Sequence, residues 1–317
     1  MVLWHLARIY FSYITARDTL EYPPLRMWVE PTAACNLSCI MCPNSELPEE
    51  KKGFMSMDLY RKIVSMAGDI GVEEFLLFNR GEPLLHRNIA EMVAMASERG
   101  IRTNIHTNGM LLDGNMARKL MDAGLGILSI SFDAISPEVY RKIRTGGDYE
   151  RVRNNIANAA KIREEKGYKT RITVESIIFP EYATIIGSED DLKARVGIDG
   201  VEYRVRPLGI WASSKEGRER HITGKFRPCR MPWYSMAVLW DGTVVPCCQD
   251  WHGEMVMGDL RSQSIMEVWN SRAYREMRKN FHRGNYSQYP LCQRCPMAHI
   301  GMKGALGMAL QYIMGRL

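Results

Sequence analysis

Three cysteines lie close together near the amino end of the chain, at positions Cys35, Cys39 and Cys42. This CxxxCxxC spacing supplies three thiolates from one loop, whereas a cubane 4Fe–4S cluster has four irons to ligate. One iron is therefore left open, and an open coordination position is where a metal site binds a substrate or cosubstrate. The alternative is a zinc ion that takes a distant fourth ligand such as His106.

A second group of cysteines lies in the C-terminal third of the chain, at Cys229, Cys247, Cys292 and Cys295, with Cys248 beside the second of them. Four thiolates saturate a cubane cluster, so such a site would transfer electrons rather than bind substrate. A structural zinc ion held by the same four cysteines is the alternative, because zinc accepts the same ligands. We expect Cys247 to ligate because it directly follows a proline at the end of a predicted strand, which leaves Cys248 as an unpaired thiol.

The composition of the 317-residue chain is that of an ordinary globular protein, with 46% hydrophobic and 25% charged residues. Its length suits one large or two ordinary domains. Eight cysteines are too few for a disulfide scaffold and no secretory leader opens the sequence, so we expect a reducing, cytoplasmic location. The net charge of +6 is spread along the chain without an aromatic platform, which argues against nucleic acid as a partner.

Short apolar runs alternate with longer helical patterns between residues 25 and 208. This alternation predicts an α/β fold in which parallel strands are joined by right-handed crossover helices. We expect a partial (β/α)6 parallel barrel, an open relative of the eight-stranded barrel whose chemistry lies at the carboxyl ends of the strands. The expected strands are 26–31, 74–79, 102–107, 127–132, 170–178 and 201–206, and the expected helices are 56–69, 87–99, 113–123, 148–166 and 189–196.

The C-terminal part has a different pattern, in which an Asp-Gly turn joins two apolar runs at 236–246 and a helical run follows at 262–282. These features predict a β-hairpin followed by helix. The two terminal segments are amphipathic; we expect them to pack on the protein or in an oligomer contact, with peripheral membrane contact and a lipid-linked substrate as the alternative. The expected divisions are an N-terminal segment 1–24, the barrel 25–208, a linker 209–227, the small iron–sulfur domain 228–296 and a C-terminal helix 297–317.

The first cysteine loop and the segments that follow the next three strands resemble the radical S-adenosylmethionine (SAM) superfamily. NRGEPLL at 79–85 is similar to the family's GGEP element, HTNG at 106–109 to its TNG turn and SISFD at 129–133 to its ribose-contacting segment, although Arg80 replaces the usual first glycine. The resemblance implies reductive cleavage of SAM to a 5'-deoxyadenosyl radical, with a flavodoxin or ferredoxin as the electron donor. The SAM contacts that it implies are Met41, Asn79, Gly81, Glu82, Asn108, Ser131 and Asp133.

The C-terminal hairpin, helix and cysteines resemble the Twitch domain, a shortened SPASM domain that holds one auxiliary 4Fe–4S cluster. The cysteine layout is similar to that of 2-deoxy-scyllo-inosamine dehydrogenases. The resemblance implies an oxidoreductase with two 4Fe–4S clusters that abstracts hydrogen from a hydroxyl-bearing small molecule, sugar or lipid headgroup, with the auxiliary cluster in electron transfer. The alternatives are a peptide maturase or an epimerase of the same group, and a non-enzymatic iron–sulfur or zinc scaffold.

Several polar residues follow the fourth expected strand or lie on the fifth and sixth. Those that face inward at the carboxyl ends of the strands would contact SAM or substrate. In an epimerase, a cysteine thiol would return a hydrogen atom to the substrate. The catalytic candidates are Arg144, Glu175, Tyr203, Arg206 and Cys248.

Overall fold

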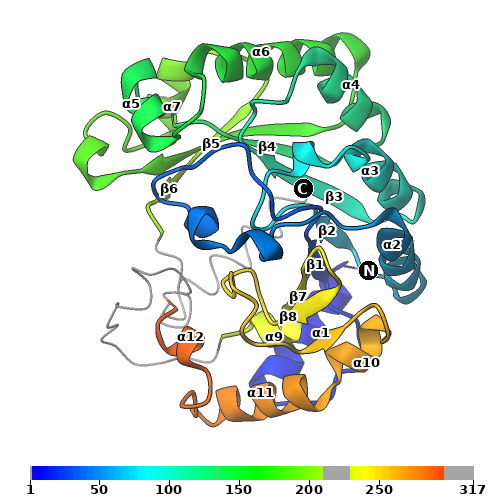
Figure 1. Cartoon of the computed structure of the whole chain (residues 1–317). Coiled ribbons are helices and arrows are strands. Elements are labelled where there is room, and N and C mark those ends of the chain that lie inside the picture. The colour runs from blue at the N-terminus through cyan, green and yellow to red at the C-terminus, as the bar shows by residue number, and fades with distance from the viewer. Residues whose placement is uncertain (1, 134, 210–228, 296–317) are drawn as a thin grey trace.

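The computed structural model describes residues 2–133, 135–209 and 229–295 of the chain (Figure 1). The expected linker and the expected C-terminal helix therefore lie almost entirely outside the described residues. Within the described ranges, no helix combines the length and apolarity that crossing a membrane requires.

One nine-stranded sheet runs through the molecule, in the order β6-β5-β4-β3-β2-β1-β7-β8-β9. Neighbouring strands from β6 to β7 are parallel, whereas β8 pairs antiparallel with both β7 and β9. The parallel part confirms the expected partial barrel, whose strands curve around an inner face (Figure 1). The strands are β1 Arg26–Val29, β2 Glu74–Leu76, β3 Arg102–Thr107, β4 Ile127–Ser131, β5 Arg171–Ile178, β6 Glu202–Pro207, β7 Ser235–Val238, β8 Thr243–Val245 and β9 Gly258–Asp259.

Helices cover the outer face of the parallel strands (Figure 1). Most begin at a polar N-cap: Ser56, Asp113, Ser136, Asp148 and Ser188 each accept a backbone hydrogen bond from the first turn. All the helices expected in this part are present, and α5 is an addition to them. They are α2 Met57–Ile70, α3 Ile89–Glu98, α4 Gly114–Asp122, α5 Pro137–Ile143, α6 Tyr149–Lys166 and α7 Glu189–Val196.

The C-terminal part contains the expected hairpin, as β7 and β8, and the expected helical run, as α10 and α11. The N-terminal helix α1 packs beside it: Trp233 Nε1 donates to Arg17 O at 2.8 Å, just beyond the end of α1. The helices are α1 Val2–Ile14, α9 Met231–Tyr234, α10 Ile265–Trp269, α11 Arg272–His282 and α12 Pro290–Gln293.

The C-terminal part continues the barrel sheet rather than forming a separate one. β7 pairs in parallel with β1, from Arg26 opposite Ser235 to Val29 opposite Val238. Behind this junction the indole of Trp233 is fully buried. Both cysteine groups are therefore positioned by a single continuous sheet.

Candidate active site

The first cysteine loop follows β1, at the carboxyl ends of the parallel strands. Burial raises the pKa of all three thiols, that of Cys42 to about 12, and negative charge on neighbouring cysteines raises the pKa values of Cys35 and Cys42 further. Thiols in this environment ionise only beside positive charge, which bound iron supplies. The structure thus brings together Cys35, Cys39 and Cys42, the three ligands expected for the first cluster.

Hydrogen bonds fix the path of this loop on both sides. Asn44 Nδ2 donates to the carbonyl oxygens of Ala33 and Arg80, both at 2.9 Å. The backbone N–H groups of residues 38 and 40 donate to the carbonyl oxygens of residues 145 and 143, at 3.0 Å each. The loop is therefore tied to the segment after β2 and to the end of α5.

A buried ion pair lies beside Cys39. Arg144 Nε donates to Asp133 Oδ2 at 2.7 Å, and the other carboxylate oxygen accepts from Ile177 N at 2.7 Å and Ser176 Oγ at 3.2 Å. Burial raises the pKa of the Cys39 thiol, and the charge and hydrogen bond of the Arg144 guanidinium oppose that rise. Arg144 is thus placed to stabilise the Cys39 thiolate, and Asp133 positions Arg144.

The Glu82 carboxylate is buried in the loop after β2 and is held by three donors. Its oxygens accept from Thr107 Oγ1 and Asn108 N, both at 2.7 Å, and from Leu84 N at 3.0 Å. Burial raises the pKa of this carboxyl, whereas these hydrogen bonds lower it. The carboxylate is therefore fixed in place between the loops that follow β2 and β3.

The segment before Glu82 packs closely against the cysteine loop. A Cβ atom at Gly81 would lie 2.3 Å from Ala34 O, so only glycine fits there. The amide of Asn79 is buried, and neither its nitrogen nor its oxygen has a hydrogen-bond partner within the described part of the chain. A buried unpaired amide is costly unless a ligand completes it. These residues fit a small polar cosubstrate, and the amino and carboxylate groups of SAM suit them.

The remaining expected SAM contacts lie on the cysteine loop, on the turn after β3 and at the end of β4. Asn108 Nδ2 donates to Asn36 Oδ1 at 2.8 Å, which joins the turn after β3 to the cysteine loop. Met41 is half-buried against the main core. Ser131, at the end of β4, lies opposite Glu175 of β5.

Arg80, the departure from the family's glycine, forms a buried ion pair with Glu30 at the end of β1. Its Nε and Nη2 atoms donate to the two Glu30 carboxylate oxygens at 2.8 and 2.6 Å, and its Nη1 donates to Trp251 O at 3.2 Å. Trp240 N also donates to this carboxylate, at 3.1 Å. Trp240 and Trp251 belong to the C-terminal part, so the pair connects the Glu82 loop with the region of the second cysteine group.

The inner face of β3, β5 and β6 carries a group of titratable side chains. Arg206 Nε and Nη2 donate to the Glu175 carboxylate at 3.0 and 3.3 Å, and His106 Nε2 lies 3.9 Å from Glu175 Oε1. Phe78 stacks on the His106 ring with centroids 4.3 Å apart. We call His106, Glu175 and Arg206 the barrel-wall cluster.

The environment sets the charge of this cluster. Burial lowers the pKa of His106, although Glu175 opposes the change, so the imidazole is neutral near pH 7. Burial alone would raise the pKa of Glu175, but the interaction with the His106 imidazole, the positive charges of Arg206 and Arg204 and the hydrogen bond from Arg206 outweigh it and hold that pKa below its usual range. Sequence reasoning assigned His106 only to a turn motif and to an alternative zinc site. The signal that could have identified His106 is the alternation of side chains along β3, which directs its imidazole to the inner face of the barrel.

Tyr203, another catalytic candidate, does not join the cluster. Its hydroxyl donates to Ile198 O at 2.6 Å and accepts from Ile198 N at 3.1 Å, in the connection between α7 and β6. Alternation along β6 places its neighbour Arg204 opposite Glu175 instead. Tyr203 therefore stabilises the approach to β6 and lies apart from the inner wall.

The second cysteine group also comes together. Burial raises the pKa values of Cys229 and Cys248 to about 12; burial also raises that of Cys247, and the charges of the other members of the group raise it further. Among the described residues of both cysteine groups, no three cysteine, histidine or acidic side chains are arranged to hold a single metal ion.

The assignment of Cys247 rather than Cys248 leads to a test. Cys247 interacts electrostatically with each of Cys229, Cys248, Cys292 and Cys295, whereas Cys248 interacts with only part of the group. We expect Cys247→Ala to lower the iron content from about eight to about four atoms per chain, and Cys248→Ala to retain about eight. Iron analysis after anaerobic reconstitution measures both; the reverse result would assign Cys248 as the ligand.

Two family profiles match the chain, one described as the radical SAM superfamily over residues 29–181 and one as an iron–sulfur cluster-binding domain, SPASM, over residues 229–296. A probable GTP 3',8-cyclase of Methanococcus maripaludis is 36% identical over 132 residues, which is 41% of this chain and 44% of the relative. The chain thus spans under half of the length of that relative. A tungsten-containing aldehyde ferredoxin oxidoreductase cofactor-modifying protein of Pyrococcus furiosus is 25% identical over 314 residues. This match covers 86% of this chain and 87% of the length of that relative.

Solved structures show the same fold. BtrN in complex with AdoMet and 2-DOIA superposes with a TM-score of 0.57 at 20% identity, covering 87% of this chain and 93% of that one. SuiB of Streptococcus suis bound to SAM superposes with a TM-score of 0.66 at 15% identity, and the match covers 93% of this chain and 75% of the SuiB chain. The two profile matches, together with the cysteine loop and the Glu82 loop, show a radical SAM domain followed by a SPASM-type iron–sulfur domain, and therefore a radical SAM enzyme whose cofactors are SAM and 4Fe–4S clusters.

Proposed function

We propose that the enzyme oxidises a hydroxyl-bearing small molecule, sugar or lipid headgroup, with the auxiliary cluster as the electron acceptor. The observation that carries this proposal is the barrel-wall cluster, which places a neutral imidazole beside a carboxylate on the inner face of the barrel. When bound, SAM and the clusters supply a 5'-deoxyadenosyl radical for hydrogen abstraction and a one-electron acceptor. The chain's own residues must hold the substrate and take up its hydroxyl proton.

Oxidation of an alcohol to a carbonyl removes one hydrogen atom from carbon, one proton from oxygen and one electron. We assign the proton to His106 Nε2, because the lowered pKa keeps this imidazole neutral and able to accept it. The ionised Glu175, 3.9 Å away, then stabilises the imidazolium. Phe78, stacked on the ring, holds the imidazole in its orientation.

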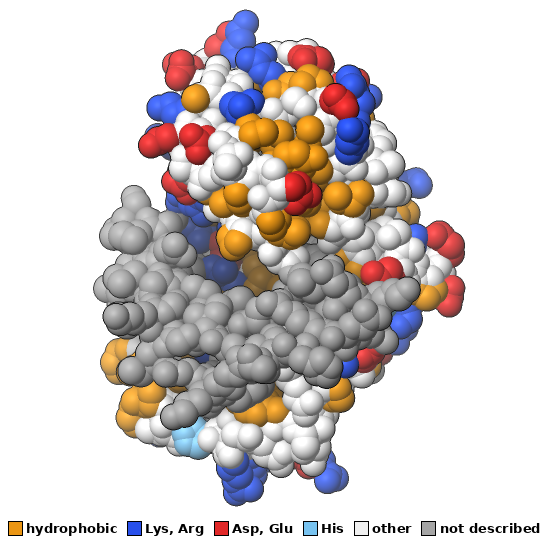
Figure 2. All heavy atoms as spheres, turned by 90° about the vertical axis from the view of Figure 1, so that its left-hand side faces the viewer, with side chains coloured by type: hydrophobic (Ala, Val, Ile, Leu, Met, Phe, Trp, Pro, Cys, Tyr) orange, Lys and Arg blue, Asp and Glu red, His pale blue; other side chains and the backbone are white. Residues whose placement is uncertain are grey.

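The charge of the wall indicates which substrates suit it. Arg204 and Arg206 are half exposed on the inner face of β6, with side-chain exposures of 41% and 58%. On the side of the molecule shown in Figure 2, basic side chains gather at a hollow below the barrel, next to residues that are not described. Guanidinium groups with free donors favour a polyhydroxylated or anionic substrate over an apolar one.

Cleavage of SAM tests the class of reaction. Reconstituted protein with SAM and a reductant, either dithionite or reduced flavodoxin, is expected to release 5'-deoxyadenosine. A candidate alcohol carrying deuterium on the oxidised carbon is expected to transfer that deuterium to the 5'-deoxyadenosine. Absence of 5'-deoxyadenosine from protein with a full complement of iron would instead indicate a non-enzymatic scaffold.

A substitution at position 106 tests the proton acceptor. His106→Asn is expected to retain SAM cleavage but to lower alcohol oxidation about 10²- to 10⁴-fold, the usual contribution of a general base. Because His106 must be neutral to act and burial lowers its pKa below the usual value of about 6.5, oxidation by the unmodified enzyme should persist to that pH and fall only at lower pH. This dependence should vanish in the variant.

His282→Asn, on the exposed face of α11, is the matched control and should behave as the unmodified enzyme. Equal oxidation rates in the two variants would contradict the assignment of His106.

Epimerisation in place of oxidation requires a hydrogen-atom donor near the substrate. The charges of Cys295 and Cys229 raise the pKa of Cys248, which places this thiol with the second cysteine group. We therefore expect Cys248→Ala to leave substrate turnover unchanged, which supports oxidation over an epimerase that uses this thiol.

A further inference from the structure

Helix α1 has an apolar face that no described residue covers. Trp4, Tyr10, Phe11 and Ile14 are exposed, with Trp4 at 73%. The other side of the helix is buried against the protein through Ile9 and Ser12. The helix contains no acidic residue. Exposed tryptophan and tyrosine on an amphipathic helix are typical of segments that lie in a membrane interface.

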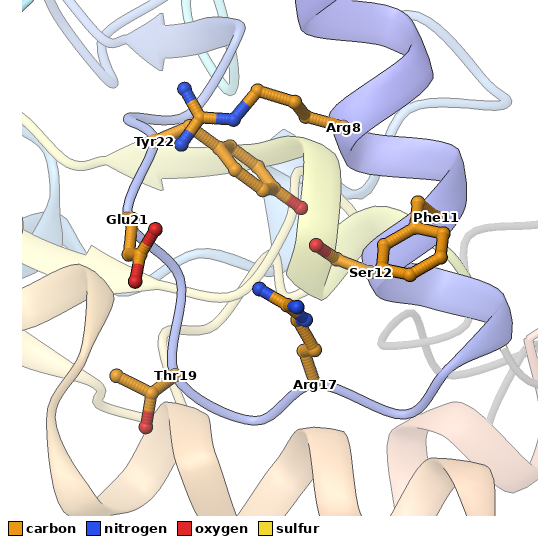
Figure 3. A pocket seen from close by; sticks show the side chains of 7 residues that line it. All are labelled: Arg8, Phe11, Ser12, Arg17, Thr19, Glu21 and Tyr22. Atoms are coloured by element: carbon orange, nitrogen blue, oxygen red, sulfur yellow. The ribbon is translucent and has the colours of Figure 1, made fainter.

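Beside this face, a pocket opens between α1 and the segment that follows it (Figure 3). The guanidinium of Arg8 lies over the Tyr22 ring at 5.3 Å, and that of Arg17 lies over the Phe11 ring at 5.4 Å. Neither guanidinium forms an ion pair or hydrogen bond with another described residue. Both are therefore available to a ligand.

The floor of the pocket is a buried phenol. Tyr22 is 3% exposed, and its hydroxyl points toward Ser12 (Figure 3). Burial raises the pKa of this hydroxyl, while its interaction with Ser12 and the charges of Arg278, Arg8 and Arg17 lower it. The hydroxyl keeps its proton near pH 7 and can donate to a bound anion.

A third guanidinium, that of Arg278, is fully buried, and its charge lowers the pKa of the Tyr22 hydroxyl. Its Nε and Nη1 donate to the backbone oxygens of Pro232 and Asp18, each at 2.8 Å, and its Nη2 has no hydrogen-bond partner among the described residues. The guanidinium lies over the rings of Trp269 and Tyr274, at 4.5 and 5.2 Å from their centroids. Burial lowers its pKa to about 10, so the group stays charged near pH 7 and adds positive charge near the pocket without lining it.

The charges around the pocket sum to an excess of positive charge. Arg8 and Arg17 line the pocket together with one acidic residue, Glu21, which is exposed and pairs with neither of them within the described part of the chain. The nearby Asp18 carboxylate is already paired with Lys279 at 2.8 Å. Guanidinium groups and a hydroxyl that converge in this way match the oxygens of a phosphate group.

We propose that the pocket binds the phosphate of an anionic phospholipid while the apolar face of α1 lies in the interface of the bilayer. The two features support one occupant because they adjoin: Phe11 belongs to the exposed face and also lines the pocket. A bilayer supplies an apolar layer and a phosphate layer next to each other. This proposal is independent of the reaction that the barrel catalyses.

Flotation of the full-length holoprotein with vesicles tests the proposal. We expect the protein to float with vesicles of phosphatidylcholine and phosphatidylglycerol and to float poorly with phosphatidylcholine alone. Each basic residue near an anionic surface contributes about five-fold to binding, so Arg8→Gln with Arg17→Gln should weaken it about 25-fold. The lysine variants Arg8→Lys and Arg17→Lys should recover most of the binding.

The matched control removes the same number of positive charges from another part of the surface. Arg118→Gln with Arg151→Gln, on the exposed sides of α4 and α6, should float as the unmodified protein does. Inorganic phosphate that displaces the protein from vesicles would support a phosphate pocket; free phosphate binding without vesicle binding would overturn the lipid assignment. Unchanged flotation of the Arg8/Arg17 variant would also overturn it. So would a protein that binds no vesicles but forms a dimer in solution, if Trp4→Gln converts that dimer to a monomer. Loss of flotation on deletion of residues 297–317 alone would assign membrane contact to that segment instead.

Discussion

Cys39→Ala is expected to abolish the release of 5'-deoxyadenosine from SAM. The change removes one of the three thiolates that leave a single iron open, and it removes the thiolate that the buried Arg144 stabilises. Two cysteines do not hold such a cluster, so the iron content should fall from about eight to about four atoms per chain. Iron analysis and chromatographic detection of 5'-deoxyadenosine measure the two effects on the same sample.

The control for this change is Cys248→Ala, which removes a thiol of similar burial that we do not assign as a ligand. It should retain both the iron and the SAM cleavage. A Cys39→Ala protein that still released 5'-deoxyadenosine at the rate of the control would show that the N-terminal triplet is not the site of cleavage.

Glu30→Gln is expected to give the largest loss of stability of any single substitution considered. The Glu30 carboxylate and the Arg80 guanidinium are almost completely buried, and the substitution leaves the cation without its counter-charge. Breaking a buried pair in this way costs about 3–5 kcal/mol. Because domains are stable by only about 5–15 kcal/mol, much of the free energy of unfolding would be lost. The midpoint of anaerobic urea unfolding, followed by tryptophan fluorescence, measures the change.

The same substitution should also weaken SAM binding. The backbone N–H of Arg80 donates to Glu30 at 3.1 Å, immediately before the Gly81-Glu82 segment, so a shift of Arg80 moves the Glu82 loop. Glu138→Gln is the matched control, because it breaks an exposed pair with Lys142 and should leave both the unfolding midpoint and SAM affinity unchanged. A Glu30 variant that unfolds at the midpoint of this control would contradict the prediction.

The sequence was sufficient to predict the features that depend on local pattern. The strands and most helices follow from apolar periodicity, and the cysteine loop follows from spacing alone. Helix α5 was missed because its seven residues are too few to show a helical period, although Ser136 and Pro137 are good start signals.

Features that depend on long-range contacts could not be predicted. The pairing of β7 with β1 joins residues that are far apart in the chain, and no local pattern specifies it. Tyr203 and Arg206 lie three residues apart and so face opposite sides of β6, but only the pairing of β6 with β5 shows which of these sides carries Glu175. The sequence shows Arg80 only as a departure from a motif, because its role depends on Glu30, which directly follows β1 and is fifty residues away in the chain.

The junction of β1 with β7 has a consequence for how the chain is made. Val29 leaves the ribosome well before its partner Val238, and at roughly 5–20 residues per second the delay is on the order of 10–40 s. During that time one side of a buried, hydrophobic strand has unpaired backbone groups, which attract other chains. Heterologous production of this enzyme should therefore gain solubility from slower initiation or from co-expressed chaperones, because both lower the concentration of half-made chains with an open edge.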